Sequence, residues 1–246
     1  EKVLRENKLK DGRVETLFVD SMKMSTYLVA FVIGELEVTE VGSVGDTQIR
    51  IIHRPGFSHQ TSFAGAAGMK ILEFFENYYQ IPYPGSKLDL IAIPDFAMGA
   101  MENVGAVTFR ESLLLIDESK ATRQELSRSV SVIAHELAHM WFGDLVTMKW
   151  WDGIWLNEAF ASLMEAIAAN GTYPEFDQWS EMNLSRSAGF GVDSLKNSRP
   201  VEFEVETPEQ AEEMFDVLTY EKGSTVLRMF EMFVGEEVFQ EGVQQY

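Results

Sequence analysis

The sequence contains no cysteine, which excludes disulfide bonds and thiolate ligands for a metal ion. It has no apolar run close to the ~20 residues that a membrane-spanning helix needs. Cationic residues are scarce: 20 Lys and Arg stand against 39 Asp and Glu, for a formal net charge of −19. This balance opposes binding to nucleic acid or to an anionic membrane. It favours cationic ligands such as a peptide's free amino terminus, although a solvated acidic surface accounts for most of the charge.

The length and the ends of the chain set further expectations. With 246 residues and 46% hydrophobic content, the chain can form one large domain or one and a half. Its first residues, EKVLRENKLKDGR, are charged and do not resemble a signal peptide. We therefore expect a cytoplasmic protein, or one whose leader has been removed.

The hydrophobic pattern changes along the chain from strands to helices. Alternating residues predict strands within 14–41 and over 46–53, and helical spacing follows over 58–80. Apolar runs over 88–93 and 104–110 predict two buried strands. Further helices are predicted at about 122–142, 153–170, 174–188, 208–217 and 219–234. The order predicts an α+β fold, in which the strands of residues 1–48 are too few to close a sheet and read as the end of a separate β domain.

The most informative motif is H-E-x-x-H, formed by His135, Glu136 and His139, followed after eighteen residues by Glu158. Residues four apart on a helix are rotated by only ~40° and rise ~6 Å, so the two histidines can hold one ion between them. Glu136 then lies beside that ion, and Glu158, near the start of the next helix, can supply a third ligand. Two imidazoles and one carboxylate leave the fourth position of a zinc ion open to water, as a catalytic site requires. The competing interpretation is that the two histidines only cap or fill a core helix. For a single histidine, that interpretation would be the favoured one.

Several segments resemble the M1 family of zinc aminopeptidases, which are gluzincins with a thermolysin-like catalytic domain. The match rests on G-A-M-E-N at 99–103, on H-E-L-A-H, and on W-L-N-E-A-F around Glu158. MSTYLVAFVIGE resembles the family's segment at the end of its β domain, and YEKGSTVLRMF, from Tyr220, resembles its catalytic-tyrosine segment. Departures are Ala159 where glycine is common, Val104 where an aromatic is common, and Asp144 where asparagine is frequent; none removes a reacting group.

The resemblance implies a division of the chain. Residues 1–48 would be the C-terminal part of a β domain, and residues 49–246 a thermolysin-like zinc peptidase domain cut short at its end. The family's upstream β segment and its helical C-terminal domain would be missing partners of this core.

The resemblance also implies roles for individual residues. One zinc ion per chain would be held by His135, His139 and Glu158, with Glu136 as general base. Tyr220 would hydrogen-bond the oxyanion of the tetrahedral intermediate; spacing alone makes it a core tyrosine. The substrate-binding residues would be Met98, Gly99, Ala100, Met101, Glu102 and Asn103.

Within that loop, Glu102 would bind the substrate's α-ammonium group and so make the enzyme an exopeptidase. Gly99 would let the backbone come close to the substrate. Met98 has two open interpretations, a wall of the pocket for the first side chain or a core methionine. Glu165, seven residues after Glu158 on nearly the same helix face, either orients a zinc histidine or faces solvent.

The function implied by the resemblance is hydrolysis of the N-terminal peptide bond of peptides with a free amine. Two alternatives stay open. One is an epoxide-hydrolase-type relative, which the intact G-A-M-E-N sequence disfavours. The other is a catalytically impaired fragment that binds zinc or peptide without turnover.

Overall fold

The structure, a computed structural model, describes all residues from 1 to 246. Its centre is a mixed sheet with the strand order β3-β4-β5-β7-β6. The strands are β3 (Glu37–Val44), β4 (Thr47–His53), β5 (Leu88–Ile93), β6 (Ala100–Met101) and β7 (Ala106–Arg110). β4, β5 and β7 run parallel, whereas the edge strands β3 and β6 run antiparallel to their neighbours. β5 is a nearly continuous apolar run because it lies between two parallel strands and is covered on its faces.

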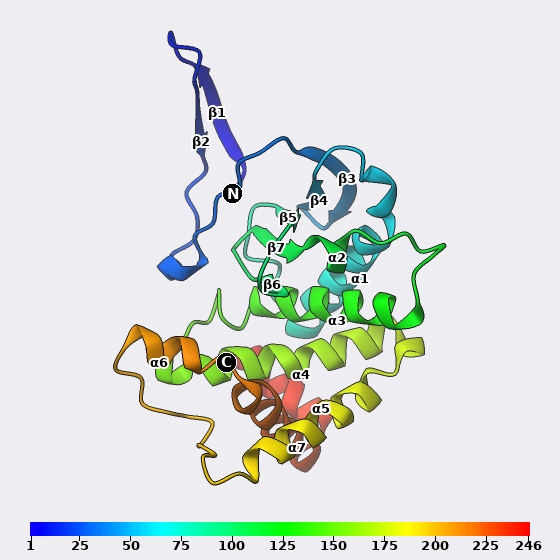
Figure 1. Ribbon diagram of the computed structural model, residues 1–246, viewed down its shortest axis with the longest axis vertical. Helices are drawn as coiled ribbons and strands as arrows, with labels where there is room; N and C mark the ends of the chain where they lie inside the picture. The colour runs from blue at the N-terminus through cyan, green and yellow to red at the C-terminus, as the bar shows by residue number, and fades with distance from the viewer.

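Helices pack against this sheet and then against one another (Figure 1). They are α1 (Ser62–Tyr79), α2 (Glu111–Leu114), α3 (Arg123–His139), α4 (Ile154–Thr172), α5 (Gln178–Asp193), α6 (Pro208–Glu213), α7 (Gly223–Val234) and α8 (Glu236–Gln245). Helix α1 contacts β3 and β4 on one side and α3 and α4 on the other. α3 and α4 run side by side, with α5 and α7 beyond α4. The mixed α+β architecture that the sequence predicts is therefore present.

The main core lies where α1, α3 and α4 meet the sheet. Ile51, Phe75, Leu90, Ile133 and Met164 are all fully buried there. Burying such a side chain stabilises the fold by roughly 1.5–3 kcal/mol. The two helices that carry His135, His139 and Glu158 are thus held by the core itself.

The strand prediction over 24–36 is wrong. Only a 3-10 turn, η1 (Thr26–Leu28), forms there, and the rest of the segment is irregular. Phe31 and Ile33 are 84% and 92% exposed, so their apolar pattern meets neither a partner strand nor a core. Alternation of apolar residues cannot by itself supply a neighbouring strand, and here none is present.

An unexpected strand, β1 (Val3–Lys8), pairs with β2 (Val14–Phe18) in a separate two-stranded sheet. This hairpin projects from the body of the molecule (Figure 1). β3 and β4 form a second hairpin, and the expected division after residue 48 passes through it. The assignment of residues 1–48 and 49–246 to two domains stays a prediction. Among the helices, none has the length and apolarity that crossing a bilayer would demand.

Candidate metal centre and active site

Helix α3 carries both histidines of the H-E-x-x-H motif on one face. The helix begins with a capping box, in which Thr122 and Glu125 satisfy each other's backbone N–H groups. It ends at His139, and the chain then turns at Gly143, whose φ is +131°. A Cβ at Gly143 would lie 3.1 Å from Nδ1 of His139. Glycine is required at that turn because the chain passes so close to the imidazole.

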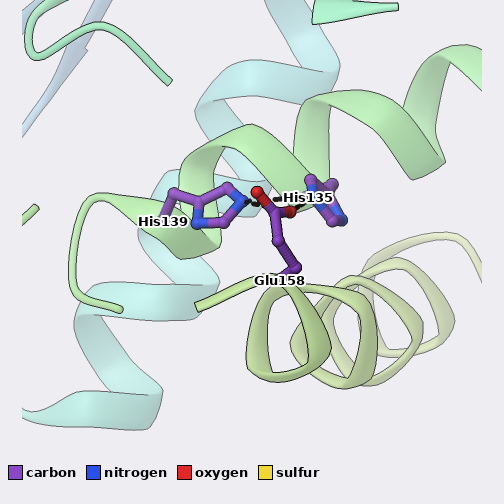
Figure 2. Close-up of side chains that lie close together, drawn as sticks. All are labelled: His135, His139 and Glu158. Atoms are coloured by element: carbon purple, nitrogen blue, oxygen red, sulfur yellow. Dashed lines mark hydrogen bonds and ion pairs between the residues drawn. The ribbon is translucent and has the colours of Figure 1, made fainter. Parts of the chain in front are cut away.

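Helix α4 brings Glu158 against the two histidines (Figure 2). Nε2 of His135 lies 3.2 Å from Nε2 of His139. Oε2 of Glu158 lies 3.2 Å from Nε2 of His135 and 3.3 Å from Nε2 of His139. All three side chains are largely buried, with 13%, 1% and 5% of the side chain exposed for His135, His139 and Glu158. The three atoms thus form a nearly equilateral triangle.

This triangle has the dimensions of a zinc site. Zinc binds imidazole nitrogen and carboxylate oxygen at about 2.0–2.2 Å, and tetrahedral geometry then separates two ligand atoms by about 3.3 Å. The observed separations of 3.2–3.3 Å match that value on all three edges. The residues present therefore fit a zinc ion.

Groups behind the histidines fix which ring nitrogen faces the triangle. Nδ1 of His135 lies 3.1 Å from Oε2 of Glu165, and Nδ1 of His139 lies 2.9 Å from the carbonyl oxygen of Phe142. Both partners are acceptors, so each Nδ1 carries the proton in a neutral ring and each Nε2 presents a lone pair. The other Glu165 oxygen accepts a hydrogen bond from Ser131. Of the two interpretations of Glu165, the structure supports the contact with a histidine.

Replacing Glu165 with glutamine is expected to weaken zinc binding by roughly 10–100-fold, because the acceptor that orients His135 is lost. Competition with a chelator of known affinity measures the change. Glu181→Gln is a matched control, because Glu181 is a carboxylate on α5 that is not part of the triangle. Zinc affinity and activity that are unchanged in Glu165→Gln would refute the orienting role.

Two buried carboxyl groups near the triangle have no hydrogen-bond partner. Oε2 of Glu136 is one such orphan, and both carboxyl oxygens of Asp144 are others. Burial raises the pKa of Glu136 to about 8 and, with the charge of Glu102 adding to it, the pKa of Asp144 to about 9. A bound cation would favour the ionised form of Glu136. An unpartnered buried oxygen beside the triangle suits a group that exchanges a proton with a water molecule.

A cavity of about 590 Å³ opens onto the triangle. Glu102 and Glu136 line it, as does Tyr220 from the π-helical turn η5 (Leu218–Lys222). The Tyr220 ring stacks on that of His135, with centroids 5.9 Å apart and an angle of 23° between the ring planes. Burial, reinforced by the charge of Glu158, raises the pKa of Tyr220, so its hydroxyl remains a donor.

A second cavity, of about 940 Å³, shares Met98, Ala100, His135, Glu136 and Tyr220 with the first. The two cavities therefore meet beside His135 of the triangle.

The residues of the predicted substrate-binding loop, 98–103, differ in which of the two cavities they line. Met98 and Ala100 line both cavities, whereas Met101 and Glu102 line only the smaller one. Met98 is therefore a wall residue and not a core residue. Gly99 lines only the larger cavity.

Asn103 lines neither cavity, in contrast to its predicted role in substrate binding. Its amide donates to the Leu28 carbonyl, 3.1 Å away, and accepts a hydrogen bond from Thr108 at 3.0 Å. Because both ends of the amide are bonded within the protein, Asn103 holds the loop in place.

Several lining residues were not found by sequence reasoning. Trp150 and Trp151 line the smaller cavity together with Tyr27 and Phe215. Adjacent tryptophans give no periodicity that distinguishes a cavity wall from a core. Tyr27 lies in a segment that the sequence predicted to be a strand.

Comparison with known proteins agrees with this geometry. The peptidase family M1 domain matches residues 63–246. The chain belongs to peptidase family M1. It is 47% identical to human endoplasmic reticulum aminopeptidase 2 over 240 residues, which cover 97% of this chain and 25% of that protein. It is 43% identical to the puromycin-sensitive aminopeptidase of Caenorhabditis elegans over 246 residues, covering 99% of this chain and 26% of that protein.

A third relative is similar to this chain to the same degree. The probable aminopeptidase 2 of Sulfurisphaera tokodaii is 46% identical over 237 residues, covering 96% of this chain and 30% of that protein. The M1 chain thus spans between a quarter and a third of the length of these relatives.

Proposed function

We propose that this chain carries the active site of a zinc-dependent aminopeptidase that hydrolyses the N-terminal peptide bond of peptides with a free amine. The observation that carries the proposal is the cavity in which Glu102 and the triangle of His135, His139 and Glu158 meet. Family membership and relatives with the name aminopeptidase support it.

A bound zinc ion would polarise the substrate carbonyl and lower the pKa of a water molecule to about 7. His135, His139 and Glu158 would hold it, and Glu136 takes a proton from the attacking water and later delivers it to the leaving amine. Tyr220 donates a hydrogen bond to the oxyanion that develops on the carbonyl oxygen. Removing such a donor typically lowers the rate by about 10²–10³.

Glu102 gives the proposal its exopeptidase character. Its side chain is buried, with 5% of the residue exposed, and it lines the same cavity as the triangle. A carboxylate held there binds the α-ammonium group of a substrate and fixes the first peptide bond at the reacting position. The larger cavity, which meets the smaller one at His135, Glu136 and Tyr220, offers room for the rest of the peptide.

At the level of the whole fold, we infer a thermolysin-like catalytic domain over 49–246, preceded by the end of a β domain. The separate β1–β2 sheet supports the latter, since it shares no strand with the central sheet. Further domains of the parent protein would complete the walls of the cleft.

The test compares two arylamide substrates that differ only in an acetyl group on the amine. The zinc-loaded protein is expected to hydrolyse an alanyl arylamide and to be inactive on the N-acetylated form, and its zinc content by mass spectrometry should be one ion per chain. Stoichiometric zinc without turnover of either substrate would favour a binding fragment. Equal turnover of both would rule out an aminopeptidase.

A further inference from the structure

Tyr27 connects an irregular segment of the chain to the candidate amine-binding loop. Its hydroxyl donates a hydrogen bond to Oε1 of Glu102, 3.2 Å away, across 75 residues of sequence. The next residue, Leu28, accepts through its carbonyl from the amide of Asn103 at 3.1 Å and is itself buried. The Tyr27 ring packs against Trp151, with centroids 5.3 Å apart. The turn η1 is therefore tied to Glu102 and Asn103 by two side-chain hydrogen bonds.

We propose that Tyr27 is a positioning residue that orients the Glu102 carboxylate for the substrate's α-ammonium group. The proposal rests on the proposed aminopeptidase function. Tyr27 occupies Oε1, which leaves Oε2 of Glu102 free to accept from the ammonium group. Tyr27 also lines the cavity, so it would lie next to the amine of a bound substrate as well as in contact with the Glu102 carboxylate.

The hydroxyl is essential to this role because Glu102 receives no other side-chain hydrogen bond. Glu102 is only 5% exposed, so water has little access to its carboxylate, and the Tyr27 hydroxyl is the donor that fixes the orientation of the carboxylate plane. Burial, followed by the charge of Glu102, raises the pKa of Tyr27, so the hydroxyl keeps its proton throughout the physiological range. Tyr27 therefore acts as a permanent donor and not as a second acceptor that would compete for the ammonium group.

A purely structural role for Tyr27 is the competing explanation, because its ring packs on Trp151. The two roles differ in their dependence on Glu102. A positioning residue has no effect once the carboxylate is gone, whereas a packing residue has the same effect with or without it. A double-mutant cycle separates them.

The experiment uses the full zinc-loaded chain and the variants Tyr27→Phe, Glu102→Ala and the double variant. Tyr27→Phe is expected to lower kcat/KM for an alanyl arylamide about tenfold, chiefly through a higher KM, which is the size of effect expected for a hydrogen bond to a charged group. In the Glu102→Ala background the same substitution should change kcat/KM less than about twofold. Tyr83→Phe is the matched control, since that hydroxyl donates to the Lys87 carbonyl and not to Glu102.

A binding measurement keeps the two proposals distinguishable. Calorimetry compares an amino acid hydroxamate, which binds zinc and carries a free amine, with its N-acetyl form. Tyr27→Phe should weaken the first about tenfold and leave the second unchanged. Equal losses for both ligands, equal losses in both Glu102 backgrounds, or no loss at all would overturn the role of Tyr27. If Tyr27→Phe weakens only the ligand with the free amine but the wild-type protein hydrolyses no substrate, the role of Tyr27 stands. The proposed aminopeptidase function is then overturned.

Discussion

Glu136→Gln is expected to lower kcat by about 10²–10⁴ while zinc stays bound. Glutamine has nearly the shape of glutamate, so the α3 backbone and the positions of His135 and His139 should be retained. The amide, however, cannot accept the proton of the attacking water. Oε2 of Glu136 has no hydrogen-bond partner in the protein, so replacing it removes no internal hydrogen bond there. A fall in kcat can therefore be attributed to the loss of the proton acceptor.

The measurement combines kcat and KM for an alanyl arylamide with zinc content by mass spectrometry. Glu213→Gln is the control: Glu213 is exposed at the end of α6 and lines neither cavity. That variant should retain wild-type kcat within about threefold, as expected for a surface carboxylate away from the site. A Glu136→Gln variant with near wild-type kcat would refute the general base, whereas one that lost zinc would show that Glu136 supports the metal.

The candidate metal centre could be predicted from sequence because its geometry is mostly local. A helical pattern over 122–142 and four-residue spacing are enough to place His135 and His139 together. Glu158 is less local, yet its place near the start of the next apolar helix indicated the right helix. The central strand over 88–93 was predictable for a related reason, since burial on both faces leaves a continuous apolar run.

The support for the amine-binding loop could not be predicted in that way. Tyr27 and Glu102 are 75 residues apart, and no periodicity relates them. The segment around Tyr27 has the apolar alternation of a strand, but its conformation depends on hydrogen bonds to the Glu102 loop and on the absence of a neighbouring strand. The hydrogen bonds of Asn103 could not be predicted for the same reason, because only the fold shows that its amide is bonded to Leu28 and Thr108.

Removing zinc is expected to abolish hydrolysis and to make the remaining stability depend strongly on pH. Burial opposes protonation of His139, but the charges of Glu102 and Glu158 outweigh it and raise the pKa of His139 to about 9 in the metal-free protein. The pKa of His135 is raised as well, where hydrogen bonds to Glu158 and Glu165 outweigh burial. A histidine whose pKa rises on folding contributes stability below its unfolded value of 6.5, and this contribution is lost as pH rises through the folded value. The metal-free protein should therefore lose stability between pH 6.5 and about 9.

Zinc has the opposite dependence on pH, because the ligands must be deprotonated to bind it. For each histidine proton released, the apparent affinity should rise about tenfold per pH unit, which corresponds to about 1.4 kcal/mol of added stabilisation. Thermal unfolding with zinc and with chelator, from pH 6.5 to 9, should show an increase in Tm on zinc addition that grows with pH. His139→Gln should lose this increase, and His59→Gln should retain it, since His59 is exposed in η2 (Ser58–Gln60) and outside the triangle. An increase that is independent of pH, or that survives in His139→Gln, would mean that zinc binds elsewhere, because only ligands that exchange protons for the ion couple its binding to pH in this direction.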